Sequence, residues 1–139
     1  MKRTLKPVWM VLAVIVAMIA FVEIPRLWAP KEVVPWRTDL AAARAESARV
    51  HKPVMLYFTA DWCGYCREMA HTTWADPAVG DALKDYVPVK IDADARQDLA
   101  DHYGVRGLPS LAVLDENGDA IRFTSGAMSS ARLIAWLHR

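Results

Sequence analysis

The chain has two cysteines, Cys63 and Cys66, and they closely follow a continuous apolar segment. That segment, VMLYFTA at residues 54–60, has the length and the β-branched and aromatic content of a strand buried on both faces of a sheet. The next residues, DWCGYCREMAHTTW, predict a helix that begins at or near Cys63, with Asp61 as its N-cap, and ends near Thr73. We therefore expect the cysteine pair at the N-terminus of a helix that follows a buried strand.

The remaining pattern of residues 37–139 predicts further helices and strands. The expected helices cover 37–52, 75–86, 95–104 and 129–139, and the expected strands cover 86–93 and both sides of Asn117-Gly118. Asp76 before Pro77 is typical of a helix start, because proline at the first helical position loses no hydrogen bond. A strand–helix–strand unit followed by a hairpin predicts an α/β domain with a mixed sheet flanked by helices.

The N-terminal segment has the layout of a signal peptide or a signal anchor. Sixteen uncharged residues, 7–22, follow Lys2, Arg3 and Lys6. No small-residue cleavage site of the A-x-A type follows the apolar run, since Leu27-Trp28-Ala29 is the best match. We therefore expect an uncleaved transmembrane helix through residues 7–24, which would place the rest of the chain outside the cytoplasm.

The prolines after this segment predict an extended tether. Pro25, Pro30 and Pro35 fall within a short stretch, and the folded part is expected to start near Trp36. The predicted organisation is an anchor and tether over 1–35 and one domain over 36–139. That domain has 12 basic and 14 acidic residues, a balance that excludes the basic footprint of a nucleic-acid binder.

The cysteine pair has two alternative roles without redox chemistry, a metal site and a structural disulfide. A structural zinc site needs four ligands, although Cys63 and Cys66 with Met69 and His71 could bind a soft ion such as Cu(I). A purely structural disulfide over so short a loop removes little entropy from the unfolded chain. A redox centre is the favoured interpretation.

The position of Cys63 assigns the roles of the two sulfurs. Unpaired N–H groups and the helix dipole stabilise a thiolate at a helix N-terminus, so Cys63 is the expected nucleophile and Cys66 the resolving cysteine. Gly64 and Tyr65, between them, contain no base, which favours a reductant or an intermediate couple over a strong oxidant.

The motifs around the cysteines resemble those of the thioredoxin superfamily. DWCGYC behind a buried strand and GLPS at 107–110 are similar to its active-site segments. The segments KPVMLYFTADWCGYCREM, WADPAVGDAL and VRGLPSLAVLDENGD further resemble the C-terminal thioredoxin-like domain of the DsbD family of membrane reductases and its single-domain relatives. The resemblance covers residues 36–139 and implies a three-layer sandwich, preceded here by one N-terminal transmembrane or signal helix.

The resemblance also implies roles for residues around the pair. Pro109 would be a cis-proline facing the active site, and Leu108 would offer its backbone to a substrate strand. Trp62 would lie beside Cys63 at the contact surface, so the implied substrate-binding set is Trp62, Gly64, Tyr65, Leu108 and Pro109.

One position departs from the family pattern. Thioredoxins have a buried Asp six residues before the first cysteine, where it assists proton transfer at the resolving thiol. Tyr57 occupies that position here. Tyrosine is a weak proton acceptor near neutral pH, so we expect water, Asp61 or Glu68 to take this role.

The expected function is that of a thiol:disulfide oxidoreductase at the bacterial inner membrane, facing the periplasm and reducing disulfides of exported proteins. The Cys63–Cys66 couple would be its redox group, with no other cofactor or metal, and a membrane electron donor of the DsbD type would recharge it. The alternatives are an oxidase or isomerase of the same fold, and a copper-binding or client-binding module without turnover. A secreted or periplasmic protein after signal cleavage is the alternative location.

Overall fold

The computed structural model describes residues 6–27 and 31–139, which belong to two compact units, Met1–Pro30 and Lys31–Arg139. The first unit contains one helix, α1 (Lys6–Leu27). The second unit contains α2 (Leu40–Val50), β1 (Val54–Thr59), α3 (Gly64–His71), α4 (Pro77–Ala82), the 3₁₀ helix η1 (Leu83–Asp85), β2 (Val87–Asp92), α5 (Gln97–His102), β3 (Ser110–Leu114), β4 (Ala120–Ser125) and α6 (Ser130–Leu137).

The N-terminal helix predicted from the sequence is present as α1, but its transmembrane character is not supported. Within the described residues, no helix combines the length and the apolar character needed to cross a membrane. The prediction of a span through 7–24 is corrected on this point, because Glu23 ends the uncharged run after sixteen residues. Sixteen helical residues rise about 24 Å against a hydrocarbon core of about 30 Å.

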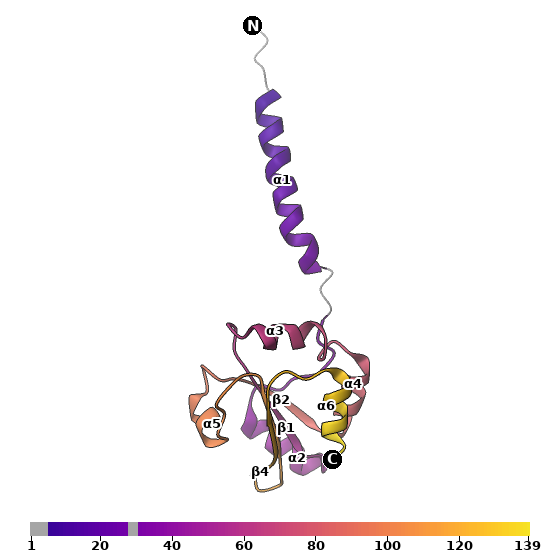
Figure 1. The fold of residues 1–139 in the computed structure, drawn as a ribbon, viewed down its shortest axis with the longest axis vertical. Coiled ribbons are helices and arrows are strands. Elements are labelled where there is room, and N and C mark those ends of the chain that lie inside the picture. The colour runs from indigo at the N-terminus through magenta and orange to yellow at the C-terminus, as the bar shows by residue number, and fades with distance from the viewer. Residues whose placement is uncertain (1–5, 28–30) are drawn as a thin grey trace. The chain divides into compact units, whose positions relative to one another are not determined.

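The sheet has the order β2-β1-β3-β4 and is mixed, as predicted. β1 is parallel to β2 and antiparallel to β3, and β4 pairs antiparallel with β3 (Figure 1). β1 and β3 are the inner strands, and all their residues are buried except Thr59, which is half-buried. The continuous apolar run that predicted a doubly buried strand therefore occupies the centre of the sheet.

Helices cover both faces of this sheet and form the three layers that were expected. Met55 and Tyr57 of β1 point to the core shared with α3, α4 and α6, while Leu56 and Phe58 point to the core shared with α2 and α5. This alternation follows from the two-residue period of a strand. In Figure 1, α5 and the pair α4 and α6 accordingly lie on opposite sides of the strands.

The compact unit begins at Lys31, five residues before the predicted domain start. Val33 donates its N–H to the carbonyl of Trp74 (2.8 Å), and Val34 is buried. Arg37 then forms a parallel bridge with Val89 on the outer edge of β2. Part of the stretch predicted as a tether, residues 31–35, is thus packed against the domain.

Local capping signals account for most helix starts. Asp39 caps α2 by accepting from the N–H of Ala42 (3.0 Å), and Asp76 caps α4 ahead of Pro77, as predicted. The helices at 37–52 and 95–104 are shorter than expected, at Leu40–Val50 and Gln97–His102. The predicted hairpin forms with Gly118 at a φ of 92°, a conformation that favours glycine.

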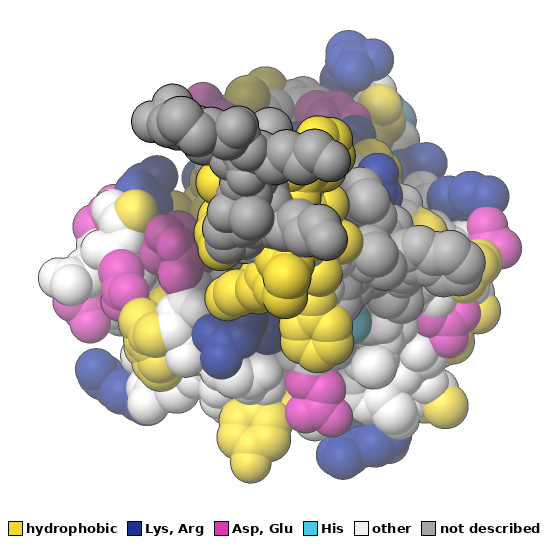
Figure 2. Space-filling model, turned by 90° about the horizontal axis from the view of Figure 1, so that it is seen from above, with side chains coloured by type: hydrophobic (Ala, Val, Ile, Leu, Met, Phe, Trp, Pro, Cys, Tyr) yellow, Lys and Arg dark blue, Asp and Glu magenta, His cyan; other side chains and the backbone are white. Residues whose placement is uncertain are grey.

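Charge is unevenly distributed over the surface of the domain. Figure 2 shows acidic side chains gathered on the left, the side on which α5 lies in Figure 1. Basic side chains are scattered over the rest of the face drawn there. The described side chains visible on this face form no basic stripe of the kind that follows a phosphate backbone.

Candidate active site

Cys63 and Cys66 form a disulfide at the start of α3. Cys63 is itself the N-cap of α3, and its Sγ accepts a hydrogen bond from the backbone N–H of Cys66 at 3.2 Å. The prediction of Asp61 as N-cap is wrong, because residues 61 and 62 form a turn before the helix begins. The carbonyl of Asp61 instead accepts a hydrogen bond from Arg67 Nη1 (2.8 Å).

The helical period explains why α3 presents its cysteines in this way. Cys66 and Met69, one turn apart, are the buried residues of α3, and Met69 packs in the core with Tyr57 and Trp74. This contact anchors the helix on the sheet and leaves Cys63 at the helix end, where backbone N–H groups lack helical partners. The arrangement stabilises negative charge on the sulfur of Cys63 once the disulfide is reduced.

The Leu108–Pro109 peptide bond is cis, as the family resemblance implied. Ser110, the next residue, pairs with Phe58 of β1. Pro109 therefore lies at the same end of the sheet as the turn that leads from β1 to Cys63. In the part of the chain that the structure describes, neither the N–H nor the C=O of Leu108 has a hydrogen-bond partner, so both remain available to an extended peptide.

Two exposed aromatic residues lie close to Cys63 in the chain. Trp62 and Tyr65 are both 67% exposed, a large fraction for aromatic side chains. The indole Nε1 of Trp62 donates a hydrogen bond to Asp94 Oδ2 at 2.8 Å. Asp94 follows β2 and is 32 residues away in the sequence, so no local spacing could have identified this contact. Gly64 has open space around it, since the nearest atom to a Cβ added there would be Nη2 of Arg67, at 3.9 Å.

Tyr57, which occupies the position of the usual acid, is buried among aromatic rings. Its ring lies 4.8 Å from that of Trp74 and 5.4 Å from that of Trp36, measured between centroids. Burial raises the pKa of Tyr57 above its ordinary value of 10.0, and the negative charge of Glu32 acts in the same direction. Tyr57 is therefore a neutral phenol near pH 7 and does not accept the proton of Cys66.

The donor set of the copper hypothesis is not assembled. Within residues 6–27 and 31–139, no group of three or more His, Cys, Asp or Glu side chains is placed to hold a metal ion. Met69 is buried in the core, whereas His71 is exposed.

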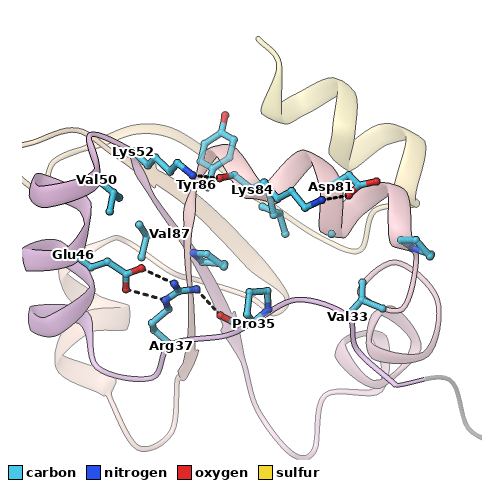
Figure 3. A pocket seen from close by; sticks show the side chains of 14 residues that line it. Val33, Pro35, Arg37, Glu46, Val50, Lys52, Asp81, Lys84, Tyr86 and Val87 are labelled. Carbon is cyan, nitrogen blue, oxygen red and sulfur yellow. Dashed lines mark hydrogen bonds and ion pairs between the residues drawn. The ribbon is translucent and has the colours of Figure 1, made fainter.

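The cavity shown in Figure 3 lies away from the cysteines, at the outer edge of β2. It measures about 480 Å³, and neither cysteine lines it. Its charged side chains are already satisfied: Arg37 binds both carboxylate oxygens of Glu46, and Lys84 binds Asp81 (Figure 3). The disulfide, and not this cavity, is therefore the candidate active site.

A three-layer α/β fold, a disulfide at a helix N-terminus and a cis-proline at the same end of the sheet define the thioredoxin class of redox proteins. A family model described as a thioredoxin-like domain matches residues 40–139. The chain belongs to this thioredoxin-like family.

Within the family, the chain is similar to the thiol:disulfide interchange protein DsbD. It is 36% identical over 95 residues to DsbD of Haemophilus ducreyi and 42% identical over 94 residues to that of Salmonella paratyphi A. Each match covers 63% of this chain but only 16% of the relative's length.

Solved structures agree with this similarity. The oxidised C-terminal domain of DsbD from Neisseria meningitidis is 30% identical, with a TM-score of 0.63 over 74% of this chain and 97% of that one. A thioredoxin from Thermus thermophilus is 25% identical, with a TM-score of 0.67 over 76% of this chain and 85% of that one. The resemblance seen in the sequence motifs is confirmed.

The first prediction concerns the reactivity of the two thiols. After reduction, limiting iodoacetamide at pH 7 should alkylate Cys63 at least about tenfold faster than Cys66, because only Cys63 lies at the positive end of α3. Burial does not separate them, since the residues are 3% and 4% exposed. Peptide mass spectrometry measures the two rates, and faster labelling of Cys66 would contradict the assigned roles.

The second prediction concerns Tyr57. The pKa of Tyr57 is raised in the folded chain, so the neutral phenol contributes fully to the unfolding free energy below about pH 10. This contribution is lost as pH rises further. Tyr57→Phe should therefore lessen the fall in unfolding free energy between pH 9 and pH 11, measured by urea titration. The exposed Tyr65→Phe is the control and should leave that fall unchanged. If the slopes of Tyr57→Phe and the parent chain coincide, the burial of an ionisable phenol is not what limits alkaline stability.

Proposed function

We propose that the chain is a thiol:disulfide oxidoreductase that reduces disulfides of exported proteins. The observation that carries the proposal is the Cys63–Cys66 disulfide at the N-terminus of α3, with the cis peptide bond before Pro109 at the same end of the sheet. This geometry gives an incoming disulfide both a nucleophile and a free backbone segment at Leu108. Only sulfur chemistry is required of the protein.

The proposed reaction consists of two successive thiol–disulfide exchange steps. The thiolate of Cys63 attacks one sulfur of the client disulfide, forming a mixed disulfide and releasing one client thiolate, which takes up a proton. The thiol of Cys66 then loses its proton, and its sulfur attacks that of Cys63, which releases the second client thiol. Two electrons pass from the chain to the client, whose two thiolates take up one proton that Cys66 releases and one proton from solvent.

The proton of Cys66 leaves to a group other than Tyr57, which is neutral at working pH. Asp61 and Glu68 are exposed carboxylates near the cysteine segment, and solvent water is the third acceptor. General-base assistance of this kind typically accelerates a proton transfer by about 10² to 10⁴-fold. We therefore expect resolution by Cys66 to be slower than in relatives with a buried acid at this position.

The proposed location is the periplasmic side of the bacterial cell envelope. The similarity to DsbD and the basic, then apolar, N-terminal segment support export of the domain, while cell fractionation decides between a membrane-bound and a released form. The periplasm is kept oxidising, so a reductant there needs a supply of electrons. A membrane electron donor of the DsbD type is the partner we propose.

The third prediction tests the activity with the full-length chain in a non-ionic detergent. Reduction of insulin by dithiothreitol should be accelerated by the parent chain and not by Cys63→Ser, because the remaining thiol, Cys66, does not lie at the positive end of α3 and is the poorer nucleophile. Cys66→Ser should instead accumulate that mixed disulfide, visible on a non-reducing gel. Glu116→Gln, in the distant hairpin, is the matched control and should retain full activity. Activity that survives in Cys63→Ser would overturn the mechanism.

The fourth prediction concerns the direction of electron flow. The reduction potential of the full-length chain, equilibrated with glutathione or a thioredoxin couple, should be near or below about −200 mV, since no base lies between the cysteines. A potential near about −120 mV would place the chain with the oxidants. That value would reverse the proposed direction and leave the exchange chemistry intact.

A further inference from the structure

Three carboxylates lie on the two segments that meet at the exposed Trp62, the turn after β1 and the end of β2. Asp61 is its neighbour in the chain, and Asp94 accepts the hydrogen bond of its indole N–H. Asp92, at the end of β2, pairs with Thr59 at the end of β1, only two residues before Asp61. Asp61 and Asp92 also line one hollow of about 320 Å³. These side chains come from two strand ends that the parallel pairing of β1 and β2 brings together.

The basic residues of the same hollow are already paired. Lys90 forms an ion pair with Glu32, and Arg96 binds both carboxylate oxygens of Asp98 at 2.8 and 2.6 Å. Among the described residues, none of the ion pairs involves Asp61, Asp92 or Asp94. The surface beside Trp62 therefore keeps an excess of negative charge.

Among the described residues, Arg67 is the one basic side chain that donates a hydrogen bond to this turn. Its guanidinium donates to the carbonyl oxygen of Asp61 and lies near Gly64 of α3, and it offsets part of the negative charge. The remaining excess agrees with the gathering of acidic side chains on the α5 side in Figure 2. On α5, Asp98 and Asp101 form ion pairs with Arg96 and Arg106, so the excess negative charge beside Trp62 is that of Asp61, Asp92 and Asp94.

The exposed indole of Trp62 favours the same kind of ligand as the carboxylates. Tryptophan is the aromatic side chain that binds cations best, through the negative face of its ring. The bond to Asp94 holds this indole in place while 67% of the residue remains exposed. The ring and the carboxylates therefore both favour a positively charged ligand next to Cys63.

We propose that Asp61, Asp92 and Asp94, with Trp62, form an acidic subsite that selects client disulfides whose attacked cysteine is flanked by lysine or arginine. The inference rests on the proposed function, because it is that function which brings a client cysteine to Cys63. Complementary charge mainly accelerates the encounter of two molecules, and salt screens it. The selection therefore acts on the rate of mixed-disulfide formation.

The test compares two peptide disulfides that differ only in charge. Each is a symmetric disulfide of one short peptide, with lysine on both sides of the cysteine in the first and glutamate in the second. The full-length chain in non-ionic detergent is reduced, freed of reductant and mixed with excess peptide, so that its dithiol passes two electrons to one disulfide. Single-turnover rate constants at low ionic strength should favour the lysine peptide by about tenfold or more.

Variants that remove negative charge test whether these three carboxylates cause the preference for the lysine peptide. Asp94→Asn keeps an oxygen that can accept from Trp62, and Asp92→Asn keeps one for the turn it caps. The triple variant adds Asp61→Asn, and any slower loss of the Cys66 proton that results affects both peptides equally and cancels in the ratio of their rates. The triple variant should reduce the ratio of the two rates to within about twofold. The matched control removes three distant carboxylates, by Asp85→Asn, Glu116→Gln and Asp119→Asn, and should keep most of the preference. In the parent chain, 0.5 M salt should abolish most of the preference for the lysine peptide.

The outcomes separate this inference from the proposed function. Equal rates for both peptides in the parent chain, or a preference that survives the triple variant, would overturn the subsite while leaving the oxidoreductase intact. An equal loss of preference in the distant control would assign the effect to net charge and also overturn the subsite. If neither peptide is reduced, the proposed function fails and the subsite fails with it. Where the triple variant does not fold, Asp94→Asn alone should lower the ratio more than the distant control does, and an unchanged ratio overturns the subsite.

Discussion

The burial of β1 on both of its faces is the constraint on which the rest of the site depends. Because β1 lies between β2 and β3, its end at Thr59 sets where the chain turns toward Cys63. The parallel partner β2 ends at the same edge, which brings Asp94 to Trp62. The antiparallel partner β3 begins there, which brings the cis-proline to the cysteines. One strand therefore positions the cysteine pair, an anchored tryptophan and the cis-proline segment.

The same burial explains the unusual acid–base character of the centre. Tyr57 belongs to β1 and points into the core between Trp36 and Trp74, so its hydroxyl group is poorly solvated and its pKa is raised. A carboxyl group at this place would titrate within the working range of a thiol, whereas the phenol does not. The chain thus combines the sulfur geometry of its family with a proton pathway that must use other groups.

Much of the fold was predictable because its signals are local. The apolar run of β1, the start of α4 at Asp76 and Pro77 and the turn at Gly118 depend on a few neighbouring residues. The errors lie where tertiary contacts override such signals. Cys63 caps α3 in place of Asp61, and residues 31–35 pack on the domain because Val34 is buried and Glu32 pairs with Lys90. A proline-rich stretch contains no sign of either contact.

The sequence by itself determined the chemistry of this protein, and the tertiary structure decided its surroundings. Two cysteines one helical turn apart, directly after a buried strand, specify a dithiol couple with an inequivalent pair of sulfurs, because helix geometry and the helix dipole act over a few residues. The bond from Trp62 to Asp94, the hollow shared by Asp61 and Asp92 and the raised pKa of Tyr57 were decided only by strand pairing and burial. Those contacts join residues that are far apart in the chain, so no local pattern contains them.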